Sequence, residues 1–217
     1  ASSGRKVSHM NIAASRATLL GLAMLSLAIA GCSKQAEKEP SATAKPPAAP
    51  AATVEVLAAA SPLARAASRG DLPEVKALVA AGANVNVTDA LGRTPLHMAA
   101  FYGRTKVSDC LLTSGADIHA RDRVGMTPLH AAVLAGARQE MELLLDRKAD
   151  VNAATDAGQT PLHLAAATGQ PKISRLLIER GADPRSKDKD DRTPLFYASR
   201  NKHPMTTEVL QQYATKD

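Results

Sequence analysis

Pairs of apolar residues recur at a fixed spacing along most of the chain. Four such pairs are separated by 33 residues each: Leu78-Val79, Leu111-Leu112, Leu144-Leu145 and Leu177-Ile178. About fifteen residues before each pair lies a shorter, alanine-rich apolar run. Two apolar runs of helical length in each 33-residue period predict two short helices per repeat.

Helix start and stop signals agree with this period. A Thr-Pro step precedes four of the alanine-rich runs, and Thr is a good N-cap while Pro fits the first helical position. The prolines of these steps, with one more in a weaker first copy, are Pro62, Pro95, Pro128, Pro161 and Pro194. Glycines follow the helices where a left-handed C-cap is expected. The period divides the chain into five units of about 58–90, 91–123, 124–156, 157–189 and 190–217.

These motifs strongly resemble the ankyrin repeat family. The resemblance is carried by Thr-Pro-Leu-His at 94–97, 127–130 and 160–163, by the Ala-Ala pairs at 99–100, 131–132 and 165–166, and by Gly-Ala-Asn/Asp at 82–84, 115–117 and 181–183. It implies an all-α solenoid of helix-turn-helix units with β-hairpin loops. In such a solenoid the first helices and the hairpin tips line a concave face that binds proteins.

Departures from the repeat pattern fall in particular units. Lys148 stands where other units have Gly, and a non-Gly residue in a left-handed turn costs roughly 1–2 kcal/mol, so an altered turn is expected there. In the last unit Asp191 replaces the turn glycine and Phe196 replaces the histidine. The first unit lacks both the Thr and the His. We expect both end units to act as caps of the solenoid.

The sequence of residues 1–31 predicts an N-terminal targeting signal. Residues 1–9 resemble an expression tag or a mis-assigned start, with Met10 as an alternative initiator. Arg16 then precedes an apolar run from Ala17 to Ala30, and Ile29-Ala30-Gly31-Cys32 resembles the bacterial lipobox. The resemblance implies cleavage before Cys32 and lipidation of this cysteine. The alternative is an ordinary secretory signal followed by a chance cysteine.

These features predict a protein of the bacterial cell envelope. A lipid on Cys32 would be its only membrane contact, with the folded part facing the periplasm, and Ser33 favours sorting to the outer membrane. Residues 32–57 are rich in Pro, Ala, Ser and Thr and lack aromatic residues. Such a composition predicts a disordered tether, which when extended would reach on the order of 75 Å. The repeats then occupy 58–217.

Charge and motifs exclude several function classes. The formal net charge is +6, and three of the cations lie in 1–31, which leaves +3 for the rest. Because charges of both signs are interspersed after residue 61, no nucleic-acid partner is expected. The sequence holds no HExxH, GxSxG, P-loop or paired CxxC pattern, and we expect neither catalysis nor a cofactor. Cys32 and Cys110 do not predict a disulfide; Cys110 reads as a buried, inert thiol.

The repeated histidines suggest a metal site, but their spacing argues against one. His97, His130 and His163 recur once per unit, so they lie about 10 Å apart, whereas zinc needs ligands at roughly 2.1 Å. In ankyrin repeats this histidine bonds the backbone and the neighbouring threonine. We therefore expect a structural role and no metal site.

A partner-binding set follows from the positions that vary on the concave face of the family. Phe101 and Tyr102, two of only five aromatic residues, are adjacent in this set. An exposed apolar cluster edged by arginines is typical of a binding hot spot. The alternative is that Phe101 packs inward and only Tyr102 is exposed. The predicted residues are Leu91, Arg93, Phe101, Tyr102, Arg123, Val124, Met126, Leu134, Gln159 and Thr168.

Two kinds of function fit these expectations for a monomeric binding protein. One is an adaptor or accessory factor for another periplasmic protein, since some periplasmic ankyrin proteins that resemble this chain accompany oxidative-stress enzymes such as catalase. The other is an inhibitor, for example an immunity protein that blocks a periplasmic toxin or enzyme. A secreted effector acting on host proteins is a third reading, which the lipobox disfavours.

Overall fold

The computed structural model describes residues 61–214, which form ten helices and contain no strand. The helices come in five pairs: α3 Pro62–Arg69 and α4 Leu72–Ala80, α5 Pro95–Phe101 and α6 Thr105–Thr113, α7 Pro128–Ala135 and α8 Arg138–Asp146, α9 Pro161–Ala167 and α10 Pro171–Glu179, α11 Pro194–Arg200 and α12 Pro204–Ala214. The predicted all-α repeat of five helix pairs is confirmed. Among these residues no helix has the length and apolar character needed to cross a membrane.

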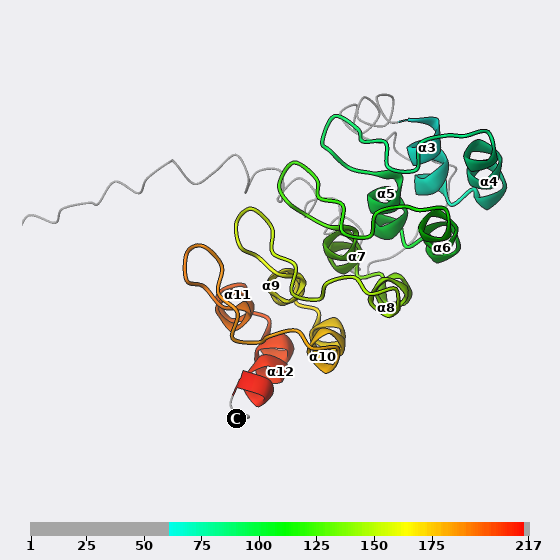
Figure 1. Cartoon of the computed structure of the whole chain (residues 1–217). Helices are drawn as coiled ribbons and strands as arrows, with labels where there is room; N and C mark the ends of the chain where they lie inside the picture. Colours follow the sequence, from blue (N-terminus) through cyan, green and yellow to red (C-terminus); the bar gives the residue numbers. More distant parts are fainter. Residues whose placement is uncertain (1–60, 215–217) are drawn as a thin grey trace, which may run out of the picture. The chain divides into compact units, whose positions relative to one another are not determined.

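The helices lie in two layers (Figure 1). The first helices of the units (α3, α5, α7, α9 and α11), here called the inner helices, stack side by side next to the hairpin loops. The second helices (α4, α6, α8, α10 and α12), here called the outer helices, stack behind them. A continuous core runs between the layers, formed by fully buried leucines such as Leu96 and Leu129 of the inner layer and Leu144 and Leu177 of the outer layer. Each unit therefore buries its apolar face against its neighbours, as solenoids require.

The hairpins are chain reversals closed by backbone and aspartate hydrogen bonds. In the first of them the Asp89 N–H donates to the carbonyl of Arg93 at 3.0 Å, and the Gly92 N–H donates to the carbonyl of Asp89 at 2.9 Å. Asp89 Oδ1 accepts from the backbone N–H groups of Leu91 and Arg93. The expected hairpin loops are present within 61–214, but none is long enough to form a β-strand pair.

The turn at Lys148 keeps the repeat geometry. Lys148 has a φ of 69°, in the left-handed region that Gly82, Gly115 and Gly181 occupy at the same point of other units. Asp191 similarly takes a φ of 57° where other hairpins have Gly. The expectation of an altered turn was wrong, because the Lys148 and Ala149 N–H groups donate to the carbonyls of Leu145 and Leu144, the same bonds that close the helix at the glycine turns.

The repeated histidines connect the second, third and fourth units each to the unit that follows. His130 Nδ1 accepts a hydrogen bond from the backbone N–H of Thr127 at 3.1 Å, which caps α7. His130 Nε2 lies 3.2 Å from the carbonyl oxygen of Gln159 in the following hairpin. Since a backbone N–H can only donate, Nδ1 must be the acceptor, and the neutral ring carries its hydrogen on Nε2 and donates it to that carbonyl. His97 and His163 bond in the same way, to the carbonyls of Met126 and Arg192.

This geometry favours the neutral imidazole. Burial lowers the pKa of all three histidines, and that of His130 falls to about 4. A proton on Nδ1 would also face the threonine N–H that now donates to it. No group of His, Cys, Asp or Glu side chains within 61–214 is arranged to hold a metal ion.

The low pKa of His130 predicts acid sensitivity. The unfolded chain takes up this proton near pH 6.5 and the folded chain only near pH 4, so the stabilisation is complete above pH 6.5 and is lost as the pH falls to 4. A shift of this size corresponds to about 3 kcal/mol. Urea unfolding at pH 7 and pH 4 should show wild-type protein losing about this much more than His130→Phe, the residue found at this position in the last unit.

Exposed His119, replaced by alanine, is the control and should keep the wild-type pH dependence. An equal loss of stability in wild type and His130→Phe would contradict the assignment of the neutral ring.

Candidate partner-binding face

The surface formed by the hairpin tips and the inner helices, here called the inner face, carries the predicted binding residues. Tyr102 and Arg123 are exposed, whereas Leu91, Val124 and Phe101 are half-buried. Met126 and Leu134 are only 7% and 5% exposed. The prediction that these two side chains belong to an exposed cluster was therefore wrong.

Met126 is buried because it lies at the base of its hairpin and not at the tip. Its N–H donates to Asp122 Oδ1 at 2.8 Å, and its carbonyl accepts from His97. Leu134 lies in the last turn of α7, at the same repeat position as Phe101. At this position an apolar side chain packs against its neighbours, so the apolar residue type indicated packing and not a contact surface.

Arg93 serves its own hairpin. Its Nε and Nη2 atoms lie 2.8 and 2.6 Å from Asp89 Oδ2, and the Arg93 side chain is only 11% exposed. Burial alone would raise the pKa of Asp89, but the hydrogen bonds and charge of Arg93 bring it below its usual value. Arg123, in the following hairpin at the repeat position of Ala90, forms no ion pair within the described range and is exposed on the surface.

Phe101 packs inward and Tyr102 is exposed. This is the alternative to an exposed cluster that contains both rings. The Phe101 ring packs against the core cluster and meets the Tyr102 ring edge to face, with centroids 5.3 Å apart. Tyr102 is the C-cap residue of α5 and is 37% exposed. The ring of Phe101 thus supports Tyr102 from below, and of these two rings it is that of Tyr102 that can meet a partner.

Gln159 and Thr168 make contacts within the repeat stack. Gln159 Nε2 donates to the hydroxyl of Tyr197 at 2.9 Å, which links the third hairpin to α11. Thr168 Oγ1 donates to the carbonyl of Leu164 at 2.7 Å, within the last turn of α9. Both are half-buried, and their polar groups already have partners in the chain.

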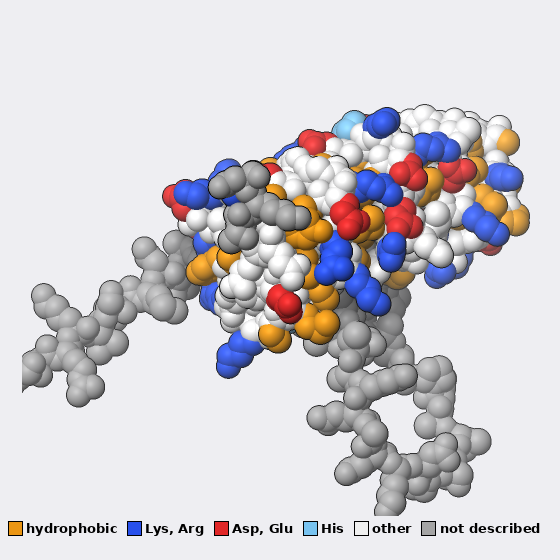
Figure 2. Space-filling view, turned by 90° about the horizontal axis from the view of Figure 1, so that it is seen from below, with side chains coloured by type: hydrophobic (Ala, Val, Ile, Leu, Met, Phe, Trp, Pro, Cys, Tyr) orange, Lys and Arg blue, Asp and Glu red, His pale blue; other side chains and the backbone are white. Residues whose placement is uncertain are grey.

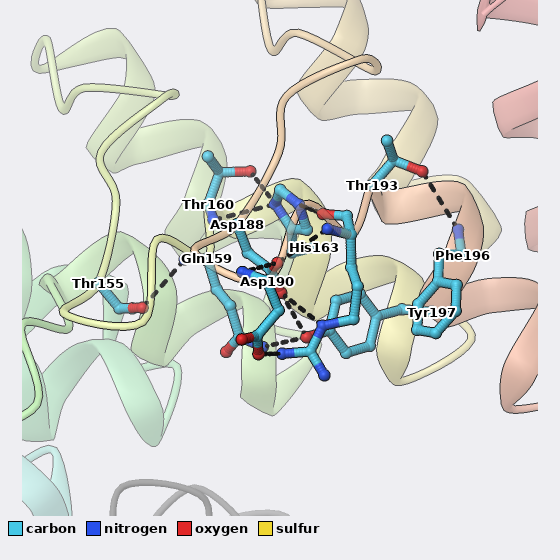
Figure 3. A network of polar contacts seen from close by, with 10 residues as sticks. Thr155, Gln159, Thr160, His163, Asp188, Asp190, Thr193, Phe196 and Tyr197 are labelled. Carbon is cyan, nitrogen blue, oxygen red and sulfur yellow. Dashed lines mark hydrogen bonds and ion pairs between the residues drawn. The ribbon is translucent and has the colours of Figure 1, made fainter. Parts of the chain in front are cut away.

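A polar network at the last hairpin joins the fourth and fifth units (Figure 3). The Tyr197 hydroxyl donates to Asp188 Oδ2 at 2.6 Å, and Arg192 Nε lies 3.1 Å from the same oxygen. Backbone N–H groups of Asp190 and Arg192 donate to Asp188 Oδ1. Burial would raise the pKa of Asp188, but Tyr197, these N–H groups and the Arg192 charge hold it below its usual value.

Tyr197 also takes part through its ring. The Arg192 guanidinium lies 5.4 Å from the ring centroid of Tyr197, a cation–π distance. The ring of His163 meets Tyr197 edge to face at 6.0 Å. Tyr197 was not identified as important from the sequence. Other units have Met98, Ala131 and Leu164 at this repeat position, and the change to tyrosine is the only sign in the sequence of a different role.

The charges of the molecule are mixed in sign. On the face shown in Figure 2, acidic and basic side chains alternate over the repeats, with apolar side chains between them. Ion pairs join outer helices of neighbouring units, as in Arg180–Asp146 at 3.0 Å and Arg147–Asp109. A basic stripe of the kind that follows a phosphate backbone is not present on that face.

Comparison with known families agrees with the geometry. A family model of ankyrin repeats, in three copies, matches residues 63–155, 109–188 and 141–217, which together cover more than half of the chain. The chain belongs to the ankyrin repeat family. No curated protein matches it. Ankyrin repeats are generally protein–protein interaction modules and typically act as non-enzymatic scaffolds.

The network of the last ankyrin hairpin predicts a stabilising role for the Tyr197 hydroxyl. Tyr197→Phe should lower the free energy of unfolding by about 2 kcal/mol, because it removes a hydrogen bond to a buried charged group. Tyr102→Phe, which removes an exposed hydroxyl, is the matched control and should change stability by less than about 0.5 kcal/mol. Chemical denaturation of both variants measures this, and equal effects would contradict the role of the network.

Proposed function

We propose that the inner face of this ankyrin stack binds a protein partner, and that the chain is an envelope-anchored adaptor or accessory factor. The observation that carries this proposal is the exposed aromatic ring of Tyr102, supported from below by Phe101, on the face that joins all the hairpins. Aromatic rings held in fixed positions are common anchors of protein interfaces. No reaction is part of the proposal.

The inner face is held in place before any partner arrives. Each hairpin bonds the next through backbone groups, with Arg123 N–H donating to the Leu91 carbonyl at 2.9 Å and Asp156 N–H donating to that of Val124 at 3.0 Å. The histidine bonds fix the same hairpins to the inner helices. A surface fixed in this way loses little conformational entropy on binding, which favours affinity.

Tyr102 is the proposed centre of the contact and Arg123 is proposed to lie at its edge. Both are exposed. An aromatic centre with an arginine at its edge suits a partner that offers an apolar side chain beside a carboxylate. Arg93 is not part of this surface, because Asp89 occupies its guanidinium.

Capture of the partner tests the inner face. The full-length chain, used as bait in extracts of the source cells, should retain a partner that Tyr102→Ala loses at least tenfold. Met205→Ala is the matched control, since Met205 is a large apolar residue, 69% exposed, on the outer helix α12. Loss of the partner in Met205→Ala but not in Tyr102→Ala would move the site to the outer helices.

The activity of the captured partner distinguishes an adaptor from an inhibitor. An adaptor leaves the partner's own activity intact in the complex. If the partner is inactive when bound and active when released, an inhibitor or immunity protein fits the molecule and an adaptor does not.

The proposed anchor rests on the sequence around Cys32, which lies outside the described residues. Ile29-Ala30-Gly31-Cys32 closes an apolar run, as a lipobox does. Lipoproteins of this type carry two or three acyl chains, and each buried methylene contributes about 0.8 kcal/mol, so the attachment would be long-lived.

Membrane fractionation tests the anchor. Cys32→Ser should move the protein from the membrane pellet to the soluble fraction, while Cys110→Ser should leave it in the pellet. Equal membrane partition of wild type and Cys32→Ser would refute lipid anchoring at this residue.

A further inference from the structure

One buried acid lies between the outer helices of the second and third units. Glu140, in the first turn of α8, is fully buried, although the same repeat position holds Val107 and Ile173 in the neighbouring units. Ser108 and Thr105 of α6 present hydroxyl groups toward it. Within the described part of the chain, neither carboxylate oxygen of Glu140 makes a hydrogen bond, and Ser108 Oγ also lacks a partner. An unpartnered buried carboxylate is costly, and most of that cost arises when it is charged.

Among residues 61–214, no cation forms an ion pair with Glu140. The charged or titratable side chains on the helices next to it are Lys106, Asp109 and Cys110 on α6, His130 on α7, Lys172, Arg175 and Glu179 on α10, and Arg138, Glu142 and Asp146 on α8 itself. Within the described part of the chain, Asp109 pairs with Arg147, Arg138 pairs with Glu142, and His130 is neutral and bonded to a hairpin carbonyl. Burial therefore raises the pKa of Glu140, and the two hydroxyl groups offset only part of this effect.

The same junction lacks a side-chain bond that the other three junctions have. In those, a polar residue just before the outer helix donates to a carbonyl at the end of the previous inner helix: Arg104 to Ser68 at 3.1 Å, Gln170 to Val133 at 3.0 Å, and His203 to Ala167 at 3.1 Å. The equivalent residue at the junction of the second and third units is Ala137, whose side chain has no donor.

A second bond is missing at this junction. Asn86 Nδ2 donates to the Gly115 carbonyl and Asn86 Oδ1 accepts from the Asp117 N–H, which joins the first and second units. Asn152 joins the third and fourth units in the same way, through Gly181 and Asp183. The residue at the corresponding position between the second and third units is His119, whose exposed side chain makes no such pair within residues 61–214.

The inner side of the junction, by contrast, is fully bonded. His97 Nε2 lies 2.9 Å from the Met126 carbonyl, and the inner helices α5 and α7 pack closely. On the outer side the exposed pair Arg147–Asp109 remains, but exposed ion pairs contribute little. The two units are therefore hydrogen-bonded along the hairpins and lack such side-chain bonds between the outer helices. This arrangement is that of a hinge whose axis lies along the hairpins.

We propose that the junction between the second and third units is a hinge, which opens on the side of α6 and α8 when the carboxyl group of Glu140 ionises. Opening lets water reach the carboxylate and separates the two outer helices, while His97 keeps the inner side together. The closed state binds the Glu140 proton more tightly than the open state. The equilibrium constant for opening therefore rises with pH, by up to tenfold per pH unit between the two pKa values.

Native-state hydrogen exchange of the full-length chain at pH 5 and pH 8 tests the hinge. After correction for the intrinsic exchange rates, protection of the amides in α6 and α8 should fall at least tenfold from pH 5 to pH 8 in wild type, and protection in α9 and α10 should fall less. Glu140→Gln, which cannot ionise, and Glu140→Ile, which carries the residue of the fourth unit, should both show no fall in protection from pH 5 to pH 8. An equal fall in these variants, or no fall in wild type, would overturn the role of Glu140.

A second pair of variants tests the missing bonds independently of the acid. Ala137→Gln supplies the donor found at Gln170, and His119→Asn with Lys148→Gly supplies the bridge found at Asn152 and Gly181. Each should raise protection in α6 and α8 severalfold at both pH values while the pH dependence remains. Unchanged protection in both would show that these absent bonds do not set the hinge.

Discussion

Three of the four junctions of the stack depend on one hydrogen-bonded side chain, the buried histidine that caps its own inner helix and donates to the next hairpin. His97, His130 and His163 each bond a threonine N–H on one side and a carbonyl 29 residues further along the chain on the other. A single ring therefore ties the start of a helix to the loop of the following unit. The ring must be neutral to accept at Nδ1 and donate at Nε2. Burial favours this neutral form, so the buried position of the imidazole supports the hydrogen bonds that it makes.

Where the histidine is replaced, the structure changes at the end of the stack. Phe196 holds this position in the last unit and is 43% exposed, with no following hairpin within the described residues to receive a hydrogen bond. The junction just before it has an additional support in the Asp188–Tyr197 network, which ties the last hairpin to α11 and, through Gln159, to the preceding hairpin. In this unit the bond that the histidines make to a following hairpin is absent from the described residues, and the Asp188–Tyr197 network bonds the unit to the preceding one.

The sequence predicted the repeat architecture well because each element has local signals. Thr-Pro steps set the helix starts, glycines set the ends, and the 33-residue period places the units, so that Pro95, Pro128, Pro161 and Pro194 all begin helices. The binding set was predicted less well. The exposure of a side chain depends on its position within the hairpin. The 33-residue period alone predicts neither the burial of Met126 nor the ion pair of Arg93 with Asp89. Glu140 could have been recognised, since an acid at a position that otherwise holds Val107 and Ile173 breaks the pattern.

Hydrogen bonds between units are more numerous along the hairpins and inner helices than between the outer helices. This difference bears on both the stability of the stack and the shape of its proposed binding surface. The hairpins are joined to one another and to the inner helices at each of the junctions that the histidines bridge, so the inner face keeps its geometry. The outer helices are joined mainly by apolar packing and by exposed ion pairs that contribute little. The outer side therefore has fewer directed bonds between units than the inner side, and the hinge that we propose at Glu140 lies on this side, between α6 and α8. Tyr102 ends the inner helix of the second unit, directly beside that junction. A rotation at the proposed hinge would move Tyr102 relative to the hairpins of the third unit, so the angle of this junction would set the shape of the proposed binding surface.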